Sequence, residues 1–406
     1  MGVLDAPGLS PTIAQRRYSS RDLAVANRTW IGPLSAGGIT DGTTTTGLYR
    51  VTHTAPIGCH DLQLLYSNVY NNVGAESDNP NPITVTAAIE YPIGVYHPVT
   101  FNGRRSVEIG GGLTVQSDPV AARIPAGASF WSRTFVQVAL GEKWPLGKLG
   151  VVGSSSLDRS MIGGPSLTDF TLTDDAQTDF SNTRQFFGPS GIVGIQETKS
   201  PVVAVVGDSI TAGLSASSNL SWATTALDAA QIPYIDVSMS SAQMDKWSLD
   251  TSRRRRAGLL SHATHVLSAL GVNNLSGAWP SPVQTQLQNM WAYFTSLGLP
   301  IVQTTLTPQT TSTDAWATVE NQTLLDAGHE ATRQSFNAYV RSSPPLISGY
   351  LDIASYVESS LNSGKFAVTG GAWTNDGTHM VTNGHDRTAA QINSDALRAL
   401  FGMAPL

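Results

Sequence analysis

The pattern of apolar residues changes at about residue 200, and this change constrains the fold more than any other feature. From Leu48 to about Val138, apolar and polar residues alternate with a period of two in short runs, which Gly, Pro, Asn and Asp separate. Such runs predict strands with frequent turns and little helix. After Ser200, apolar strands alternate with helical stretches, which predicts an α/β domain with a parallel sheet between two layers of helices.

The period-two region predicts a β-sandwich or jelly roll. Its strand candidates are residues 62–66, 83–89 and 107–109. Residues 117–120 and 124–128 each contain a proline, which cannot donate to a central ladder, so we expect sheet edges and turns there. Residues 140–198 are irregular and either complete the sandwich or link it to the next domain.

The first 45 residues are rich in Gly, Pro, Ser and Thr and show no sustained period. We expect an extended arm with one short helix near residues 16–25. Arg16, Arg17, Arg21 and Arg28 make this arm basic, and a solvated arm is favoured over an anionic docking site. Because 406 residues are too many for one ordinary core, the predicted division is an arm (1–45), a β-sandwich accessory domain with linker (46–198) and an α/β domain (199–406).

In the α/β region, the carboxyl ends of the parallel strands are where catalytic groups are expected. The predicted strands are 202–206, 232–238, 264–270, 300–306 and 349–353, and the predicted helices are 220–230, 253–261, 282–297, 328–342 and 385–401. Ser209 and Asn273 each follow one of these strands directly, so both are expected at that edge of the sheet.

Two short motifs together supply the residue types that serine ester hydrolysis needs. Ser209 comes after the apolar run 202–206 and before the small residues 211–213, so its hydroxyl is expected to be exposed at a strand-to-helix turn. There its backbone N–H can point at an oxyanion. Near the C-terminus, Asp376 precedes His379 by three residues, a spacing that lets the carboxylate hold Nδ1 and leaves Nε2 free for the serine. Taken alone, an aspartate that caps a turn is an equally good interpretation of this second motif.

Other candidates lie in the loops that follow the predicted strands. Asn273 is either a turn residue or a side-chain amide donor to an oxyanion. Ser240 and Ser241 follow the second strand and could offer a further backbone N–H. Most tryptophans are expected in the core, but Trp279 and Trp373 lie near these loops and could line a substrate pocket.

Residues 200–402 resemble the SGNH, or GDSL-type, lipase and esterase superfamily. Four blocks match in order, namely residues 207–210 (Gly-Asp-Ser-Ile), 236–241 (Asp-Val-Ser-Met-Ser-Ser), 271–274 (Gly-Val-Asn-Asn) and 376–379 (Asp-Gly-Thr-His). Segments 305–308 and 333–339 also resemble stretches between those blocks. The N-terminal sandwich resembles the β-domain of some bacterial two-domain members, through residues 99–103 and 117–127.

The resemblance implies a flavodoxin-like three-layer fold with Ser209 as nucleophile, His379 as base and Asp376 as the residue that orients the base. It also implies an oxyanion site made by the N–H groups of Ser209 and Ser241 and the amide of Asn273. Asp208 and Asn274 belong to the same blocks and are candidates for substrate binding. Ser241 stands where the family has glycine, and Asn274 stands where many relatives have aspartate.

The expected activity is hydrolysis of a short acyl ester, with an acylated small molecule or polysaccharide as the partner. We favour acetyl because Gly213, Ser215 and Ala216, which follow the nucleophile, do not suggest a long acyl tunnel. No cofactor or metal is expected, since neither a Walker loop nor a His-Glu-x-x-His motif occurs. The alternative is a particle-borne protein, for instance of a phage tail, that keeps this fold to bind surface glycans.

Composition excludes several other classes. A net charge of −6 with only 13% charged residues argues against a nucleic-acid partner. The single cysteine, Cys59, permits no internal disulfide and is expected in the core. No stretch approaches the roughly 20 apolar residues of a membrane span. No signal peptide is visible, and we expect an extracellular or virion-associated location. The basic run 253–256 is expected on a solvated helix face, and the sequence leaves the oligomeric state open.

Overall fold

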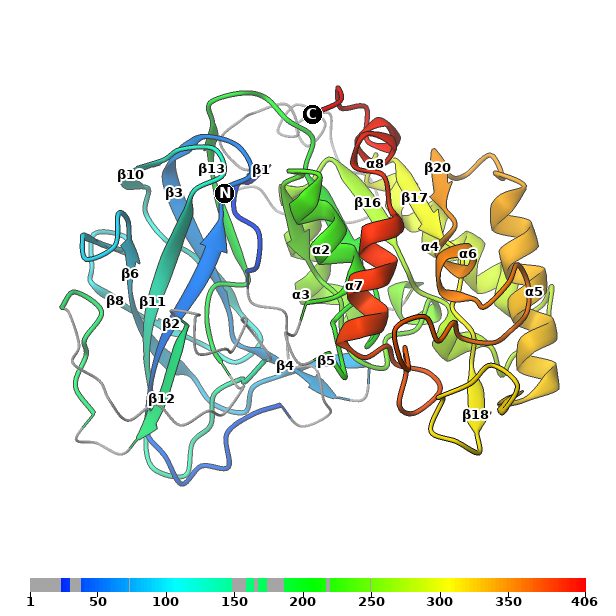
Figure 1. The fold of residues 1–406 in the computed structure, drawn as a ribbon. Coiled ribbons are helices and arrows are strands. Elements are labelled where there is room, and N and C mark those ends of the chain that lie inside the picture. Colours follow the sequence, from blue (N-terminus) through cyan, green and yellow to red (C-terminus); the bar gives the residue numbers. More distant parts are fainter. Residues whose placement is uncertain are drawn as a thin grey trace.

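Two parts of the chain lie side by side, one built on antiparallel sheets and one on a parallel sheet with helices (Figure 1). The structure is a computed structural model that describes residues 23–29, 38–72, 74–147, 158–163, 167–173, 186–216, 220–248 and 250–406. Each part has its own buried hydrophobic cluster. The change of fold class falls between Gln196 and Val203, close to the change of pattern in the sequence.

Two antiparallel sheets form the N-terminal part. The first contains β1 (Leu23–Ala24), β13 (Gly191–Gln196), β3 (Cys59–Ser67) and β10 (Val120–Ile124) in that order, with β9 (Thr114–Gln116) also paired to β3. The second contains β12 (Arg159–Gly163), β2 (Thr46–Thr54), β11 (Ser129–Gln137), β6 (Ile83–Glu90) and β7 (Tyr96–Pro98), with β8 (Ser106–Ile109) paired to β6.

The core of this part lies between the two sheets. Side chains of β10 alternate between buried and exposed, as a strand with one face on a core should. A hydrogen bond of 2.7 Å between Tyr66 Oη in β3 and Thr134 Oγ1 in β11 joins the two sheets across the core. Cys59 is fully buried in this cluster, as the sequence predicts, and burial raises the pKa of its thiol to about 12.

The N-terminal segment differs from the prediction where the structure describes it. The expected helix near residues 16–25 is wrong for Leu23 and Ala24, which pair with β13 as strand β1. The reason is that residues 23–26 are all apolar and buried, so they complete a sheet edge and do not extend into solvent. Arg28 Nε lies 3.0 Å from Asp228 Oδ2, so this cation is paired within the molecule. Arg16, Arg17 and Arg21 lie outside the described residues.

A five-stranded parallel sheet forms the centre of the C-terminal part. Its order is β15 (Tyr234–Asp236), β14 (Val203–Val206), β16 (His265–Ser268), β17 (Ile301–Thr304) and β20 (Gly349–Leu351). All five strands were predicted from the sequence. Four of them, β14 to β17, are buried along nearly their whole length, which is why they appear as continuous apolar runs and not as alternating ones.

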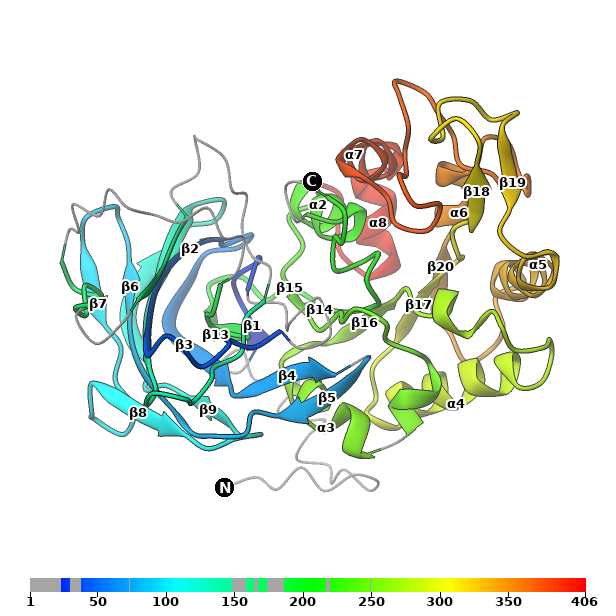
Figure 2. The same cartoon turned by 90° about the horizontal axis from the view of Figure 1, so that it is seen from below.

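Helices cover both faces of this sheet (Figure 2). One layer contains α2 (Trp222–Ala229), α6 (Ile353–Val357), α7 (Thr382–Gln391) and α8 (Ser394–Leu400). The other contains α3 (Asp250–Leu259) and α4 (Val283–Ser296), and α5 (Ala327–Arg341) packs against α4 beside the edge strand β20 (Figure 2). Short 3₁₀ turns, η1 (Asp245–Ser248), η2 (Leu260–His262) and η3 (Val272–Asn274), lie in the connections.

Two helix predictions need correction. The single last helix at 385–401 is two helices, because Asn393 caps α8 by accepting a hydrogen bond from the Ala396 N–H. The expected helix start after Ser209 is a run of turns over residues 209–215. There Gly213 and Ser215 adopt left-handed φ angles of 73°, which a right-handed helix cannot contain.

Two hairpins extend from the sheets toward the motif loops. The first, β4 (Val69–Asn72) with β5 (Ala75–Asp78), leaves the N-terminal part and lies beside α3 (Figure 2). The second, β18 (Thr310–Ser312) with β19 (Gln322–Leu324), follows β17. The sequence analysis predicted neither hairpin.

The basic run 253–256 is not simply a solvated face. Arg256 is buried and its Nε lies 2.6 Å from Glu76 Oε1 in β5, and Arg255 lies 3.4 Å from Asp78 in the same strand. That prediction is therefore wrong for these two residues, because the first hairpin covers this side of α3. The side chains of Arg253 and Arg254 lie outside the described residues.

Candidate active site

The loops that carry the four sequence blocks meet at the carboxyl edge of the parallel sheet. Strand β14 lies between β15 and β16, so the segments after these three strands are neighbours. The Met239 N–H donates to the Gly207 carbonyl at 3.0 Å, which joins the second block to the first. Asn273 Nδ2 donates at 3.0 Å to the carbonyl of Ala242, the residue directly after the second block, which joins the third block to that loop.

Ser209 lies at the turn that follows β14, and its side chain contacts the last block. Ser209 Oγ is 2.7 Å from His379 Nε2, although 170 positions separate the two residues. Ser209 is only 6% exposed. Gly207 is required just before it, because a Cβ there would overlap the Thr211 side chain.

His379 and Asp376 come from the turn before α7. Asp376 Oδ2 lies 2.6 Å from His379 Nδ1, and Asp376 Oδ1 accepts the backbone N–H groups of Thr378 and His379. The carboxylate therefore orients the ring and caps the turn at once, which combines the two interpretations of this motif. The turn needs Gly377, whose φ is 78° and whose Cα faces the Thr310 carbonyl with no room for a Cβ.

The hydrogen bonds of this turn also fix the charge of Asp376. Partial burial alone would raise the pKa of its carboxyl, but the hydrogen bonds from the His379 side chain and from the two backbone N–H groups outweigh it. The pKa of Asp376 is therefore held well below its ordinary value. Because the lowered pKa keeps this group ionised at neutral pH, an imidazolium formed on His379 would face a negative charge.

Two further oxyanion candidates, Ser241 and Asn273, lie on the loops that follow β15 and β16. Ser241 has a left-handed φ of 63°, which is unusual for a residue other than glycine. Asn273 is half-buried, and its hydrogen bond to the Ala242 carbonyl uses one of its two amide hydrogens. Gln243 Nε2 donates to the Asn273 carbonyl at 2.9 Å and closes a small ring of contacts between the loops.

Asp208 and Asn274, both candidates for substrate binding, are buried beneath the edge. Asp208 is 1% exposed and accepts the Ile210 N–H at 2.9 Å, and burial raises the pKa of its carboxyl to about 6. Asn274 donates to Asp245 Oδ1 and Gln286 Oε1 and accepts the Met244 N–H. Both residues thus support loop structure in this structure.

The two predicted pocket tryptophans lie against other parts of the protein. Trp373 is 3% exposed, and its indole N–H donates to the Thr369 carbonyl. Trp279 packs on Phe336 and Tyr339. Sequence reasoning did not single out Trp316, which is half-buried and lies against Gly377 in the triad turn. Trp316 reaches this turn because it lies in the loop between β18 and β19, and no sequence motif marks that hairpin.

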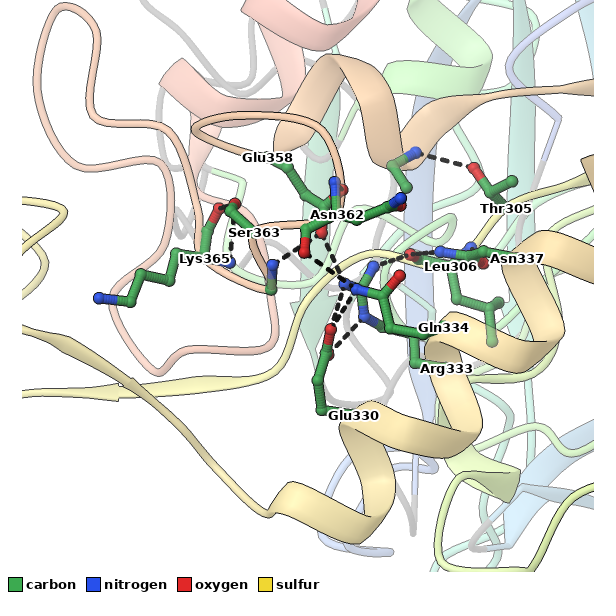
Figure 3. A network of polar contacts seen from close by, with 12 residues as sticks. Thr305, Leu306, Glu330, Arg333, Gln334, Asn337, Glu358, Asn362, Ser363 and Lys365 are labelled. Atoms are coloured by element: carbon green, nitrogen blue, oxygen red, sulfur yellow. Dashed lines mark hydrogen bonds and ion pairs between the residues drawn. The ribbon is translucent and has the colours of Figure 1, made fainter.

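A buried ion network supports the segment that leads to the second hairpin (Figure 3). Arg333 in α5 is 1% exposed and pairs with Glu330 at 2.7 Å and Glu358 at 2.5 Å. Its Nη1 also donates to the Leu306 carbonyl at 2.9 Å. Four residues further on, the Thr310 N–H donates to the Gly377 carbonyl at 2.8 Å, so this network braces the turn of Asp376 and His379 indirectly.

Two buried carboxyls make the stability of the fold depend on pH. Burial raises the pKa of Asp236, at the end of β15, to about 6. The folded state therefore binds this proton more tightly than the unfolded chain, where the pKa is about 4. The contribution of Asp236 to stability is therefore greatest below about pH 4, falls as the pH rises to about 6, and stays lower above it.

We expect Asp236→Asn to remove the part of this dependence that comes from Asp236, while Asp208, the other buried carboxyl, keeps its own part. Because each pKa unit is worth about 1.4 kcal/mol and the unfolded carboxyl is already half ionised at about pH 4, wild type should lose about 2 kcal/mol relative to the variant between about pH 4 and about pH 7.5. Urea unfolding of both proteins at the two pH values measures the difference. Asp386→Asn, an exposed site in α7, is the control and should follow wild type. Parallel pH profiles for wild type and Asp236→Asn would contradict the assignment.

Within the described part of the chain, no group of three or more His, Cys, Asp or Glu side chains is placed to hold a metal ion. Among the helices that the structure describes, none combines the length and apolar character needed to cross a membrane.

The chain is similar to solved structures of GDSL-like lipases and carbohydrate esterases. A GDSL-like lipase from Bacteroides thetaiotaomicron is 16% identical, with 49% of this chain and 87% of that chain covered and a TM-score of 0.33. An acetylxylan esterase from Geobacillus stearothermophilus is 14% identical. The match covers 51% of this chain and 97% of that chain, with a TM-score of 0.33. A family two carbohydrate esterase from Clostridium thermocellum is 10% identical. The match covers 93% of this chain and 98% of that chain, with a TM-score of 0.36.

No protein-family model and no curated protein matches the chain. Identities of 10–16% and TM-scores of 0.33–0.36 are too low to assign an activity, which therefore has to come from the site itself.

Proposed function

We propose that this chain is a serine ester hydrolase of the SGNH type, with Ser209 as its nucleophile. The observation that carries the proposal is the continuous line of hydrogen bonds from Ser209 Oγ through the His379 ring to Asp376. The sheet order supports it: numbered along the chain, the strands run 2-1-3-4-5, the order of flavodoxin-like sheets. The first block follows the strand at the switch point of that order, where ligands of such sheets bind.

In the proposed mechanism, His379 Nε2 takes the proton of Ser209 as Oγ attacks the ester carbonyl carbon. The carbonyl oxygen becomes an oxyanion, which the N–H groups of Ser209 and Ser241 and the free amide hydrogen of Asn273 stabilise. When the intermediate collapses, His379 gives its proton to the alcohol. A water, deprotonated by the same nitrogen, then cleaves the acyl-enzyme and releases the acid.

We propose a short acyl group, acetyl first, as the acid side of the substrate. Gly213, Ser215 and Ala216 follow the nucleophile, so the described part of this segment presents mostly small side chains, which favour a short acyl group. On the alcohol side, the aromatic ring of Trp316 lies beside Gly377, two residues before His379 in the triad turn. Such a ring suits the flat face of a sugar ring, so an acylated carbohydrate is the proposed natural substrate.

A panel of p-nitrophenyl esters from two to twelve acyl carbons, together with acetylated polysaccharides, tests this function. We expect turnover of the acetyl ester that exceeds that of long-chain esters, and release of acetate from the polysaccharide. A chain-length optimum at long acyl groups would contradict the acetyl assignment while leaving the hydrolase intact. Absence of turnover for every ester would contradict the hydrolase itself.

We expect Asn273→Ala to lower kcat about 10²–10³-fold and to leave a measurable rate. The reason is that one oxyanion donor is lost while the nucleophile and base remain. The rate with p-nitrophenyl acetate measures the effect, and titration of reactive Ser209 with a serine-directed phosphonate corrects for any misfolded fraction. An unchanged kcat would show that Asn273 is only a turn residue.

A further inference from the structure

Ser241 has a backbone conformation that favours glycine and is disfavoured for residues with a Cβ. Its φ is 63°. Its side chain is exposed, and none of the hydrogen bonds described for this part of the chain involves that side chain. Left-handed residues of this kind persist where the surrounding structure over-determines them. The cause has to be sought in the groups around the peptide that joins Ser240 to Ser241.

The contacts to that peptide come from the hairpin of β4 and β5, which belongs to the N-terminal part. Asn71, fully buried, donates its side-chain Nδ2 to the Ser240 carbonyl at 3.2 Å. Gly74 lies against the Ser241 carbonyl so closely that a Cβ there would overlap it. The Gly74 N–H in turn donates to Asn71 Oδ1 at 2.9 Å, so the two residues form one unit.

The Ser240 carbonyl and the Ser241 N–H belong to the same planar peptide group. In a trans peptide these two groups point in opposite directions. By holding the carbonyl on the side of the hairpin, Asn71 therefore turns the Ser241 N–H to the other side. A hairpin that served only to join the two parts would not need to contact these two carbonyls.

The strand that pairs with β4 is also tied to this loop, through Glu76, which lies directly opposite Asn71. Glu76 in β5 accepts from Arg256 Nε at 2.6 Å, and both side chains are more than 90% buried. The Glu76 carboxylate also accepts the backbone N–H groups of Arg255 and Arg256 in the middle of α3. Arg256 Nη1 donates to the Val237 carbonyl, at the start of the segment that ends with Ser241, at 3.3 Å. The turn end of the hairpin thus contacts this loop directly, through Asn71 and Gly74, and also through Glu76 and Arg256.

We propose that the β4–β5 hairpin is a positioning element of the oxyanion site, with Asn71 and Gly74 as its positioning residues. In this proposal, residues of the antiparallel N-terminal part position an oxyanion donor of the C-terminal part, in addition to any role in binding substrate. This inference rests on the ester hydrolase function proposed above, in which the Ser241 N–H is an oxyanion donor.

The test compares Gly74→Ala, Asn71→Ser and Gly127→Ala with wild type. Gly74→Ala introduces the overlap with the Ser241 carbonyl. Asn71→Ser removes the donor to Ser240 and keeps a short acceptor for the Gly74 N–H. Gly127→Ala is the matched control, because Gly127 has a similar φ of 76° in the same part of the chain, with no atom within 4 Å of an added Cβ. Activity with p-nitrophenyl acetate and the affinity for an arylboronic acid, which forms a tetrahedral anion on the serine, are the readouts.

We expect kcat to fall about 100-fold in Gly74→Ala and about tenfold in Asn71→Ser, with KM within about twofold of wild type. Boronate affinity should weaken in parallel, whereas Gly127→Ala should keep both values. If both hairpin variants match Gly127→Ala, the inference is overturned and the hydrolase stands. If Gly74→Ala does not fold, Asn71→Ser decides alone, and full activity in it overturns the inference. A wild-type protein without Ser209-dependent turnover overturns both proposals.

Discussion

Replacing Ser209 by alanine is expected to lower kcat for p-nitrophenyl acetate about 10⁶-fold, the largest effect of any single substitution in this chain. The loss is this large because the variant has no atom that can form the acyl-enzyme, although His379, Asp376 and the oxyanion donors remain in place. In such a unit, loss of the nucleophile or of the base alone removes nearly the whole rate that the unit supplies. We expect the free energy of unfolding to stay close to that of wild type, because the hydrogen bond that Ser209 Oγ makes with His379 lies at the edge of the sheet and not in the core.

Ser276→Ala is the matched control, because this serine is exposed on the loop after Asn274. It should keep the activity of wild type. A Ser209→Ala protein that melts like wild type and still hydrolyses the ester within about tenfold of its rate would contradict the nucleophile assignment.

The second large effect is expected for Asp376→Asn, with kcat lower by about 10⁴-fold. Asp376 Oδ1 accepts two backbone N–H groups, from Thr378 and His379. In the variant, the amide oxygen should therefore occupy the Oδ1 position, and the NH₂ group should face His379 Nδ1. That nitrogen would then have to accept, which leaves the proton on Nε2, where it cannot receive the one from Ser209.

The measurement is kcat with p-nitrophenyl acetate across neutral pH, where the lowered pKa of Asp376 keeps its carboxylate ionised in wild type. Asp386→Asn, in the exposed face of α7, is the control and should be unaffected. If Asp376→Asn keeps more than about a tenth of the activity, Asp376 only caps the turn, which was the alternative interpretation of this motif.

Much of the α/β part could be predicted because its strands are buried on both faces. Runs such as residues 202–206 are apolar throughout, and each ends at a polar loop, so their number and positions follow from the sequence alone. The same logic places Ser209 and Asn273 on one edge. The contact of Ser209 with His379 required the resemblance, since no local pattern relates segments 170 positions apart.

What could not be predicted depends on partners that lie far away in the sequence. Arg256 belongs to a run of four arginines, and only the approach of Glu76 makes it buried and paired. Residues 23–26 are a short apolar stretch, too short to show a period, and the open edge of β13 decides that they form a strand. The left-handed Ser241 follows from Asn71 and Gly74, which carry no motif.

The most direct test of the account is the reaction of the intact protein with a serine-directed phosphonate, read by intact mass and peptide mapping. We expect one phosphonyl group per chain on Ser209, a reaction that is abolished in Ser209→Ala and slowed in Asp376→Asn. An unlabelled wild-type protein, or a label that maps to another serine, would contradict the claim that Ser209 and His379 form a catalytic pair.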